Sequence, residues 1–461
     1  IDTIVVHTNF TNTVKRVITI TLDDLLTPKG MRELRAIFTA PESFRAEQTT
    51  EQVTRTAAVK FAELADHLRK QGDDPEAIAH FLIRLLFCLF AEDIDLLPQK
   101  LFSRLVNLHR SHPQNFHHTL AGLFGAMATG GTFGVEPVRH FNGGLFDDDR
   151  VLHLDYAGLG ILQEIAALDW GSIEPSILGT LFERSLDPGK RSQLGAHYTS
   201  RDDILLLVEP VLMAPLRREW EGVQAQAQKL VERRDAVQAG GAAYHERIRD
   251  LRNLFLAFAE RIAAVRVLDP ACGSGNFLYV ALRQLLDLEK EVSQYASSLG
   301  LPALFPQSSP TQLYGIELNE YAHELAQATV WIGYIQWLHE NGYGVPSEPI
   351  LKRLDNIKQM DAILAFDADG NPVEPAWPEA EVIVGNPPFL GGGRIRGELG
   401  NHYADRLFRF YGSRLPNFSD LVCYWFERAR SLIENGKVQR AGLLATNSIR
   451  GGANRTVLER I

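Results

Sequence analysis

The chain has 461 residues, enough for two or three domains with cores of their own. Its formal net charge of −10 excludes a protein whose whole surface wraps nucleic acid, so any nucleic-acid face must be a local patch. No apolar run reaches membrane-spanning length, no signal peptide is visible, and three widely spaced cysteines favour a reducing cytoplasm. The chain starts without Met and ends at Ile461 inside a predicted helix, which indicates a fragment.

Residues 1–155 are predicted to hold two strands followed by helices. Alternating β-branched residues in 1–22 predict two short strands, interpreted as the tail of a preceding domain. A helical connector is predicted for 23–155, with an apolar stripe from Glu51 to Lys70 and a buried helix that begins after Asp74. Several metal-binding residue types occur here without a metal-ligand spacing, so we expect no metal site; they are His80, Cys88, Glu92, Asp93 and Asp95.

Residues 156–262 are predicted to form a second helical block. It leads to the segment 195–200, where Thr199 or Ser200 is expected to cap the helix that follows. A helix N-terminus with a free hydroxyl suits a carboxylate ligand. Charged residues on both sides of a glycine pair then predict an exposed helical hairpin.

The pattern changes at residue 263, where strands and helices begin to alternate. A short apolar strand ends at Asp269, and the glycine-rich turn that continues to Phe277 leads into a helix. Strand, glycine turn and helix form the first unit of a doubly wound α/β fold, but the turn matches neither a dinucleotide nor an NTP fingerprint. A second strand ends in Glu317, where such folds hold a ribose diol. A third edge supplies Asp361, a candidate acceptor for an adenine amino group.

The fourth predicted strand leads into the loop Asn386-Pro387-Pro388-Phe389. An exocyclic amine is a poor nucleophile, because its lone pair is delocalised into the ring. Two acceptors, the Asn386 side-chain oxygen and the Pro387 carbonyl, are suited to hold both amine hydrogens and keep the lone pair on a methyl donor. The prolines stiffen the loop, and Phe389 offers a face for a flipped base. On these residues alone, a proline turn with a core Phe stays open.

Taken together, these segments resemble a known family. The segments 269–277 and 386–389, with Glu317 and Asp361, look like successive motifs of class I S-adenosylmethionine-dependent DNA adenine-N6 methyltransferases. The segment 195–200 resembles the most N-terminal cofactor motif, which gives the gamma-type order. The chain is more closely similar to MmeI-like type IIL/IIG restriction–modification enzymes over most of its length. Further segments carry that similarity: Phe87–Asp93, Leu178–Pro188 and Arg450–Arg455.

The resemblance implies a Rossmann-like, class I methyltransferase domain at 263–461, C-terminally incomplete, after a helical connector at 23–155 and a lead-in at 156–262. It implies S-adenosylmethionine as cofactor and double-stranded DNA with a flipped adenine as partner. The parent would be a bacterial or archaeal restriction–modification or phage-defence enzyme. Such enzymes also carry nuclease and target-recognition domains, which these residues do not show, so cleavage and target sequence stay open.

Motif by motif, the resemblance also implies roles for single residues. Tyr198 and Thr199 would face the methionine carboxylate, and Asp269 would hold the methionine amino group. Glu317 would take the ribose hydroxyls and Asp361 the cofactor adenine. The remaining cofactor-binding residues lie in the turn after Asp269: Ala271, Cys272, Gly273, Gly275, Asn276 and Phe277. In this interpretation Cys272 is not a nucleophile.

The same comparison implies that Asn386 and Pro387 bind the target amine, with Pro388 in the same catalytic loop and Phe389 stacking on the base. A basic stretch follows this loop, with five arginines against two acids between residues 391 and 415. A flexible glycine run is expected to open it. Arg394 and Arg396 are therefore candidates for phosphate contacts, and a helix with a solvated basic face is the alternative.

Two other functions remain open on the sequence. Loops of this type also serve methyltransferases that act on protein glutamine or on RNA guanine amines. A methyltransferase-like module that holds cofactor or DNA without transferring a methyl group is a further alternative, although the retained Asn386 and Phe389 argue against it.

Overall fold

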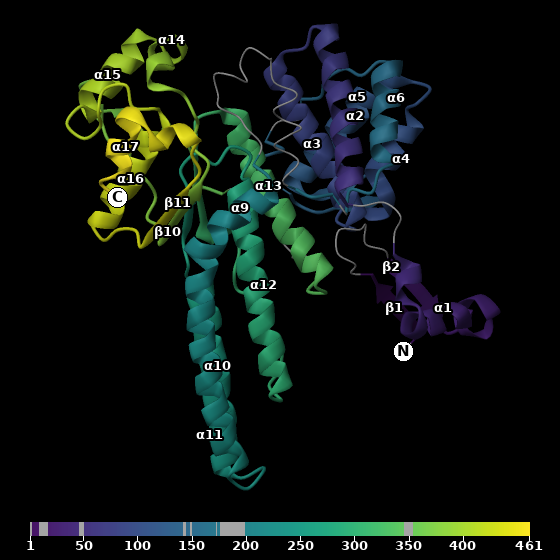
Figure 1. The fold of residues 1–461 in the computed structure, drawn as a ribbon. Helices are drawn as coiled ribbons and strands as arrows, with labels where there is room; N and C mark the ends of the chain where they lie inside the picture. Colours follow the sequence, from purple (N-terminus) through teal and green to yellow (C-terminus); the bar gives the residue numbers. More distant parts are fainter. Residues whose placement is uncertain are drawn as a thin grey trace.

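The computed structural model describes residues 2–8, 17–45, 50–141, 144–147, 150–171, 173–175, 199–344 and 354–461. Within these ranges, the helices are too short or too polar to span a membrane. The chain forms a parallel sheet wrapped by helices, with a bundle of helices to one side and a long helical hairpin that extends away from both (Figure 1).

The centre of the fold is a five-stranded parallel sheet with the order β11-β10-β5-β6-β7. Its strands are β5 (Val267–Asp269), β6 (Leu313–Glu317), β7 (Ile357–Gln359), β10 (Val382–Gly385) and β11 (Arg440–Leu443). Strand order reverses between β5 and β10, and in open α/β sheets such a break is where ligands bind.

Helices cover both faces of this sheet, because its strands alternate apolar residues between them. Val267, Val382 and Val384 join a buried cluster with α9 (Arg201–Val208), α12 (Asn276–Ser298) and α13 (Glu320–Glu340). Leu268, Ile316 and Ile383 join a second cluster on the opposite face. The predicted doubly wound fold, preceded by helices, is confirmed.

The opposite face is covered by the C-terminal helices, which Figure 1 shows together beside β10 and β11. They are α14 (Ile395–Leu399), α15 (Asn401–Tyr411), α16 (Val422–Glu434) and α17 (Gly452–Leu458), with 3-10 turns η6 (Gly392–Arg394) and η7 (Asn447–Arg450). A small hairpin, β8 (Ala365–Phe366) and β9 (Pro372–Val373), precedes β10.

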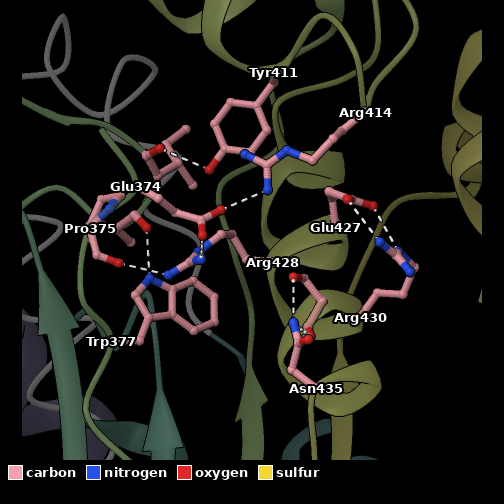
Figure 2. A network of polar contacts seen from close by, with 12 residues as sticks. Glu374, Pro375, Trp377, Tyr411, Arg414, Glu427, Arg428, Arg430 and Asn435 are labelled. Atoms are coloured by element: carbon pink, nitrogen blue, oxygen red, sulfur yellow. Dashed lines mark hydrogen bonds and ion pairs between the residues drawn. The ribbon is translucent and has the colours of Figure 1, made fainter. Parts of the chain in front are cut away.

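An ion-pair network ties these helices to the segment after β9, as Figure 2 shows. Glu374 forms ion pairs with Arg414 at 2.7 Å and with Arg428 of α16. Arg428 also donates to the carbonyl of Pro375 at 2.6 Å and lies over the ring of Trp377. Because Arg428 is buried, removing its carboxylate partner would leave a charge without compensation, so Glu374 holds α16 and the loop that precedes it to the segment after β9.

The helical bundle precedes the sheet in sequence. Its elements are α2 (Thr50–Gln71), α3 (Pro75–Asp93), η3 (Pro98–Lys100), α4 (Leu101–Leu108), α5 (Pro113–Thr129), a hairpin of β3 (Gly131–Phe133) and β4 (Glu136–Val138), and α6 (Tyr156–Ala166). Asp74 caps α3 by accepting from two backbone N–H groups, as the sequence predicted. α6 packs on α2 and α4, so the bundle continues beyond residue 155.

The bundle contacts the sheet domain through α3 and α13, which lie side by side. The imidazole of His80 lies 2.6 Å from the carboxylate of Glu324, and the other ring nitrogen contacts Arg84. Gln336 donates to the carbonyls of Gly171 and Ile173. Apolar residues of both parts belong to one continuous buried cluster, so the bundle is packed against the sheet domain rather than tethered to it.

Two further parts complete the chain. A hairpin of β1 (Thr3–His7) and β2 (Val17–Thr21) precedes η1 (Asp24–Leu26), α1 (Pro28–Thr39) and η2 (Pro41–Phe44), and the two strands are those that the sequence predicted. After α9, a π-helical turn η4 (Glu209–Met213) leads into the predicted hairpin of α10 (Ala214–Asp235) and α11 (Ala242–Ala263), and η5 (Pro310–Gln312) precedes β6.

Gly333 of α13 allows the helix to pack on the buried ring of Tyr279 in α12. A Cβ atom at Gly333 would lie 2.2 Å from that ring, whereas a Cβ at Gly222 of α10 would have no neighbour within 4 Å. Gly333→Ala should therefore lower the free energy of unfolding by ~1–3 kcal/mol through overpacking. Gly222→Ala, the matched helical control, should raise it by up to ~1 kcal/mol. Urea denaturation measures both, and an equal response of the two variants would contradict this packing.

Candidate active site

Four polar side chains stand where the strands of the sheet end. β5 ends at Asp269 and β6 at Glu317, Asp361 follows β7 by two residues, and Asn386 directly follows β10. The strands are parallel, so these residues share one edge, in the order Asn386, Asp269, Glu317, Asp361. The structure thus brings together the residues that the sequence singled out.

The turn after β5 brings backbone rather than side chains to this edge. Gly273 and Gly275 have φ of +52° and +84°, the left-handed region that favours glycine. At Gly275 a Cβ would lie 2.9 Å from the Cα of Ala326 in α13, so helix packing also requires a glycine there. The N–H of Cys272 donates to the carbonyl of Ile316 at 3.0 Å, which fixes the turn to β6.

The other residues of this turn are placed as follows. Cys272 and Phe277 are buried in the hydrophobic cluster that includes α12. Burial raises the pKa of the Cys272 thiol well above its usual range, which argues against a thiolate nucleophile. Asn276 is buried at the N-terminus of α12, and Ala271 donates its N–H to Asp269 at 3.0 Å. Trp425 of α16 holds the turn from the other side by donating to the carbonyl of Pro270.

Asp269 is a buried acid, and Glu317 beside it is half-buried. Burial raises the pKa of Asp269 to about 8, although the N–H of Ala271 opposes the shift and Glu317 adds to it. Burial likewise raises the pKa of Glu317, while its carboxylate accepts from the N–H of Gly273 at 2.9 Å and of Asn319 at 2.8 Å. Because the charge of Glu317 adds to the raised pKa of Asp269, a positively charged ligand at this site would be favoured by both acids.

Asp361 has more partners than the sequence indicated. One carboxylate oxygen accepts from the N–H groups of Ile363 at 2.8 Å and Leu364 at 3.1 Å. The other accepts from the hydroxyl of Tyr403 in α15 at 2.7 Å. This geometry orients the carboxylate at the edge of the sheet, but leaves it fewer lone pairs for a ligand than an exposed acid has.

Asn386 carries the most informative contact at this edge. Its side-chain nitrogen donates to the hydroxyl oxygen of Thr199 at 2.8 Å. Its side-chain oxygen is buried and has no hydrogen-bond partner in the part of the chain that the structure describes. Buried polar atoms usually have a partner, so this oxygen is available as an acceptor for a ligand. Pro387 is buried beside it, and Pro388 and Phe389 are half-buried.

The sequence predicted that Thr199 faces a carboxylate of the ligand. It did not predict the hydrogen bond between Thr199 and Asn386. The two residues are 187 positions apart, so nothing local signals the contact. Ser200, next in the chain, caps α9 by accepting from the N–H of Asp203, as predicted. Tyr198 lies outside the described residues. Leu318 directly follows Glu317 at the same edge and is 62% exposed, and no sequence pattern marked it.

Arg394 and Arg396 follow the loop 386–389 and are exposed, Arg394 at the end of η6 and Arg396 in α14. Arg394 pairs with Glu398 at 2.7 Å and Arg396 with Asp405 at 2.5 Å.

The glycine run before these arginines was expected to be flexible, and this is wrong for Gly392. A Cβ there would lie 2.0 Å from the carbonyl oxygen of Phe418, so Gly392 is needed for close packing.

Metal binding has no support at this edge or elsewhere in the ranges that the structure describes. No group of three or more His, Cys, Asp or Glu side chains is arranged to hold an ion in those ranges.

Two family models match the chain in succession. Residues 76–146 match the helicase spacer domain of MmeI, and residues 245–460 match the DNA-methyltransferase domain of MmeI. Over these ranges the chain is similar to MmeI, with a region like its helicase spacer domain followed by a region like its DNA-methyltransferase domain.

Two relatives show the extent of the similarity. DNA methyltransferase A of Bacillus subtilis (strain 168) is 28% identical over 417 residues, which cover 87% of this chain and 44% of that protein. The solved structure of the type IIL restriction-modification enzyme MmeI in complex with DNA is 27% identical, with a TM-score of 0.69, and the match covers 88% of this chain and 53% of that one. The chain thus spans about half the length of these relatives.

DNA methyltransferases of this kind use S-adenosylmethionine, and the residues described above fit it. When bound, this cofactor supplies an electrophilic methyl group. Asp269 suits its ammonium group, because a cation beside a buried acid favours the ionised form of that acid. Glu317 keeps lone pairs for hydroxyl groups, and the glycine turn between them lets the backbone approach a ligand.

The raised pKa of Asp269 makes a prediction about stability. The folded protein holds this proton up to about pH 8, while the unfolded chain releases it near the ordinary value of 3.8. Asp269 therefore stabilises the fold fully below about pH 4, and this contribution is lost as the pH rises to about 8. Asp269→Asn cannot titrate, so its unfolding free energy should fall less than that of the wild type over this range. A tenfold difference in proton affinity between the folded and unfolded states corresponds to ~1.4 kcal/mol.

Urea denaturation at pH 5 and pH 8 measures this difference without any ligand. Asp369→Asn, at an exposed acid, is the matched control and should follow the wild type. Equal pH dependence of Asp269→Asn and the wild type would show that Asp269 is ionised in the folded protein.

Proposed function

We propose that this chain is the catalytic part of a site-specific DNA adenine-N6 methyltransferase that uses S-adenosylmethionine. The observation that carries the proposal is the buried side-chain oxygen of Asn386, which has no partner among the described residues. An adenine amino group has two hydrogens to donate, and its nitrogen becomes nucleophilic when acceptors hold them.

The proposal gives Thr199 the role of orienting the Asn386 amide toward the target. The hydroxyl oxygen of Thr199 accepts from the amide nitrogen, so the amide oxygen points away from it. With the amide reversed, its NH₂ group would face the target amine and repel it. Asn386 and the carbonyl of Pro387 would thus hold both amine hydrogens, and Phe389 would stack on the flipped base.

The cofactor roles follow the order of the residues along the sheet edge. Asp269 would hold the methionine ammonium group, with the backbone of Ala271 and Gly273 beside it, and Tyr198 would face the carboxylate. Glu317 would bind the ribose hydroxyls, and Asp361 the adenine amino group. These assignments place the methyl donor beside Asn386, because β5 and β10 are adjacent strands.

DNA is the proposed partner, and its contacts would include phosphates near Arg394 and Arg396.

We propose that the chain has four parts: residues 1–22 as the end of a preceding domain, 23–155 as connector, 156–262 as lead-in, and 263–461 as catalytic domain. The packing of α6 on α2 and α4 supports moving the end of the connector to about residue 167. Target sequence and DNA cleavage would depend on further domains of the parent protein.

The experiment is transfer of a labelled methyl group to DNA by the full-length parent protein, followed by nucleoside analysis. We expect N6-methyladenine as the product, and the rate of labelling should fall strongly in Asn386→Ala. Label confined to protein or RNA would contradict the proposal, and so would methylcytosine as the only product in DNA. Absence of all transfer with the cofactor bound would favour a binding module.

A further inference from the structure

Phe418 is an exposed aromatic residue in an unusual backbone conformation. It lies in the loop between α15 and α16, and 75% of the residue is exposed. Its φ is +65°, which is uncommon for a residue with a bulky side chain. Strained conformations of this kind persist when the surrounding structure fixes them, and they cluster at functional sites.

The strain comes from a tight turn. The N–H of Ser419 donates to the carbonyl of Pro416 at 3.3 Å, so Asn417 and Phe418 are the two central residues. Only the second of them has a positive φ, which is the pattern of a type II turn. Gly or Asn usually occupies that second position, yet Asn417 stands first and Phe418 second. The turn therefore holds a large ring in solvent where a smaller residue would fit better.

Asp420 joins this turn to the catalytic loop. One carboxylate oxygen accepts from the N–H of Gly392 at 3.0 Å, and the other accepts from the hydroxyl of Ser448 at 2.8 Å. The N–H of Leu421 also donates to the carbonyl of Leu390 at 2.8 Å. Gly392 follows Phe389 by three residues, which places its Cα at most ~11 Å from that of Phe389. Phe418 is thus held at a fixed and short distance from the proposed base pocket.

Basic residues flank the same loops. Arg394 follows Gly392, the glycine that packs on the Phe418 backbone, by two residues, and its side chain is 66% exposed. Arg450 is exposed at the end of η7, two residues after Ser448. An exposed ring in a loop whose neighbouring loops carry cations suits a nucleic acid, because the phosphates attract the cations and a base can stack on the ring.

We propose that Phe418 is an aromatic wedge that enters the DNA beside the target base and stacks on a neighbouring base while the target is outside the helix. Apolar side chains inserted between base steps are a known way to unstack a duplex. The inference rests on the proposed function, since a wedge is needed only if the target base leaves the helix. A rigid turn suits this role, because a ring already held in position loses little conformational freedom on insertion.

The test uses the full-length protein and two duplexes of the same sequence. One has 2-aminopurine at the target position, whose fluorescence rises when the base leaves the stack, and the other has adenine there, on which the methylation rate is measured. Phe418→Gly and Phe418→Asn remove the ring but tolerate a positive φ, so both should fold with a melting temperature no lower than the wild type. Fluorescence per bound duplex and the methylation rate should fall about five-fold or more, the scale of stacking one base. Phe418→Tyr should retain both.

A mismatch opposite the target lowers the cost of removing it from the stack, so it should restore fluorescence and rate to the two ring-less variants. Phe38→Ala, at a residue of α1 that is 81% exposed, is the control and should behave as the wild type on both duplexes. Wild-type values in the ring-less variants, or a loss that the mismatch does not rescue, would overturn the wedge alone. A wild-type protein that methylates no adenine would overturn the proposed function and with it this inference.

Discussion

The site depends on the close approach of Asp269 to Gly385 between two neighbouring strands. A Cβ atom at Gly385 would lie 2.4 Å from a carboxylate oxygen of Asp269, so only glycine allows the two strand ends to meet. Gly385 is the last residue of β10 and precedes Asn386, whereas Asp269 is the last residue of β5. The proposed cofactor turn and catalytic loop are therefore set side by side by the sheet itself. Such fixed proximity is what methyl transfer requires, because reacting atoms must meet at a near-attack distance.

Two features around this contact serve opposite needs. The acid Asp269 is buried and Glu317 is half-buried, which costs stability until a cation balances them. Asn386 is held by Thr199 at one end and is free among the described residues at the other. Both features are unfavourable for the protein alone and favourable with ligands bound. These unfavourable features are offset by the extensive apolar packing among the bundle, the sheet, α12 and α13.

The sequence predicted the parts of the fold that short-range patterns determine. Apolar runs that end in Asp269, Glu317 and Asn386 located three strands, and glycines located the turn, because these signals are local. Contacts between distant segments were not predictable. The hydroxyl of Thr199 reaches Asn386, and that of Tyr403 reaches Asp361, only after the chain has folded.

The sequence-based prediction of a flexible glycine run was wrong at Gly392, where glycine allows close packing. Gly392 looked like part of a flexible run, but it is glycine because the carbonyl of Phe418 leaves no room for a side chain. Flexibility and close packing have the same signature in a sequence, and only neighbouring atoms distinguish them. No sequence pattern marked the loop that carries Phe418. Its residue Asp420 is hydrogen-bonded to Gly392, Ser448 and Asn454, which are distant in the sequence.

The central claim is that Asn386 acts on the target amine and not on the cofactor, and one comparison tests it directly. Asn386→Ala should lower turnover at saturating cofactor by ~2–4 kcal/mol of barrier, the usual size for one transition-state hydrogen-bond partner. The dissociation constant of S-adenosylmethionine, measured by calorimetry on the same protein, should stay within about two-fold of the wild type, since ~0.4 kcal/mol is small beside that loss. Asn435→Ala, at an exposed residue after α16, is the control and should change neither quantity. Weakened cofactor binding with intact turnover at saturation would contradict the account.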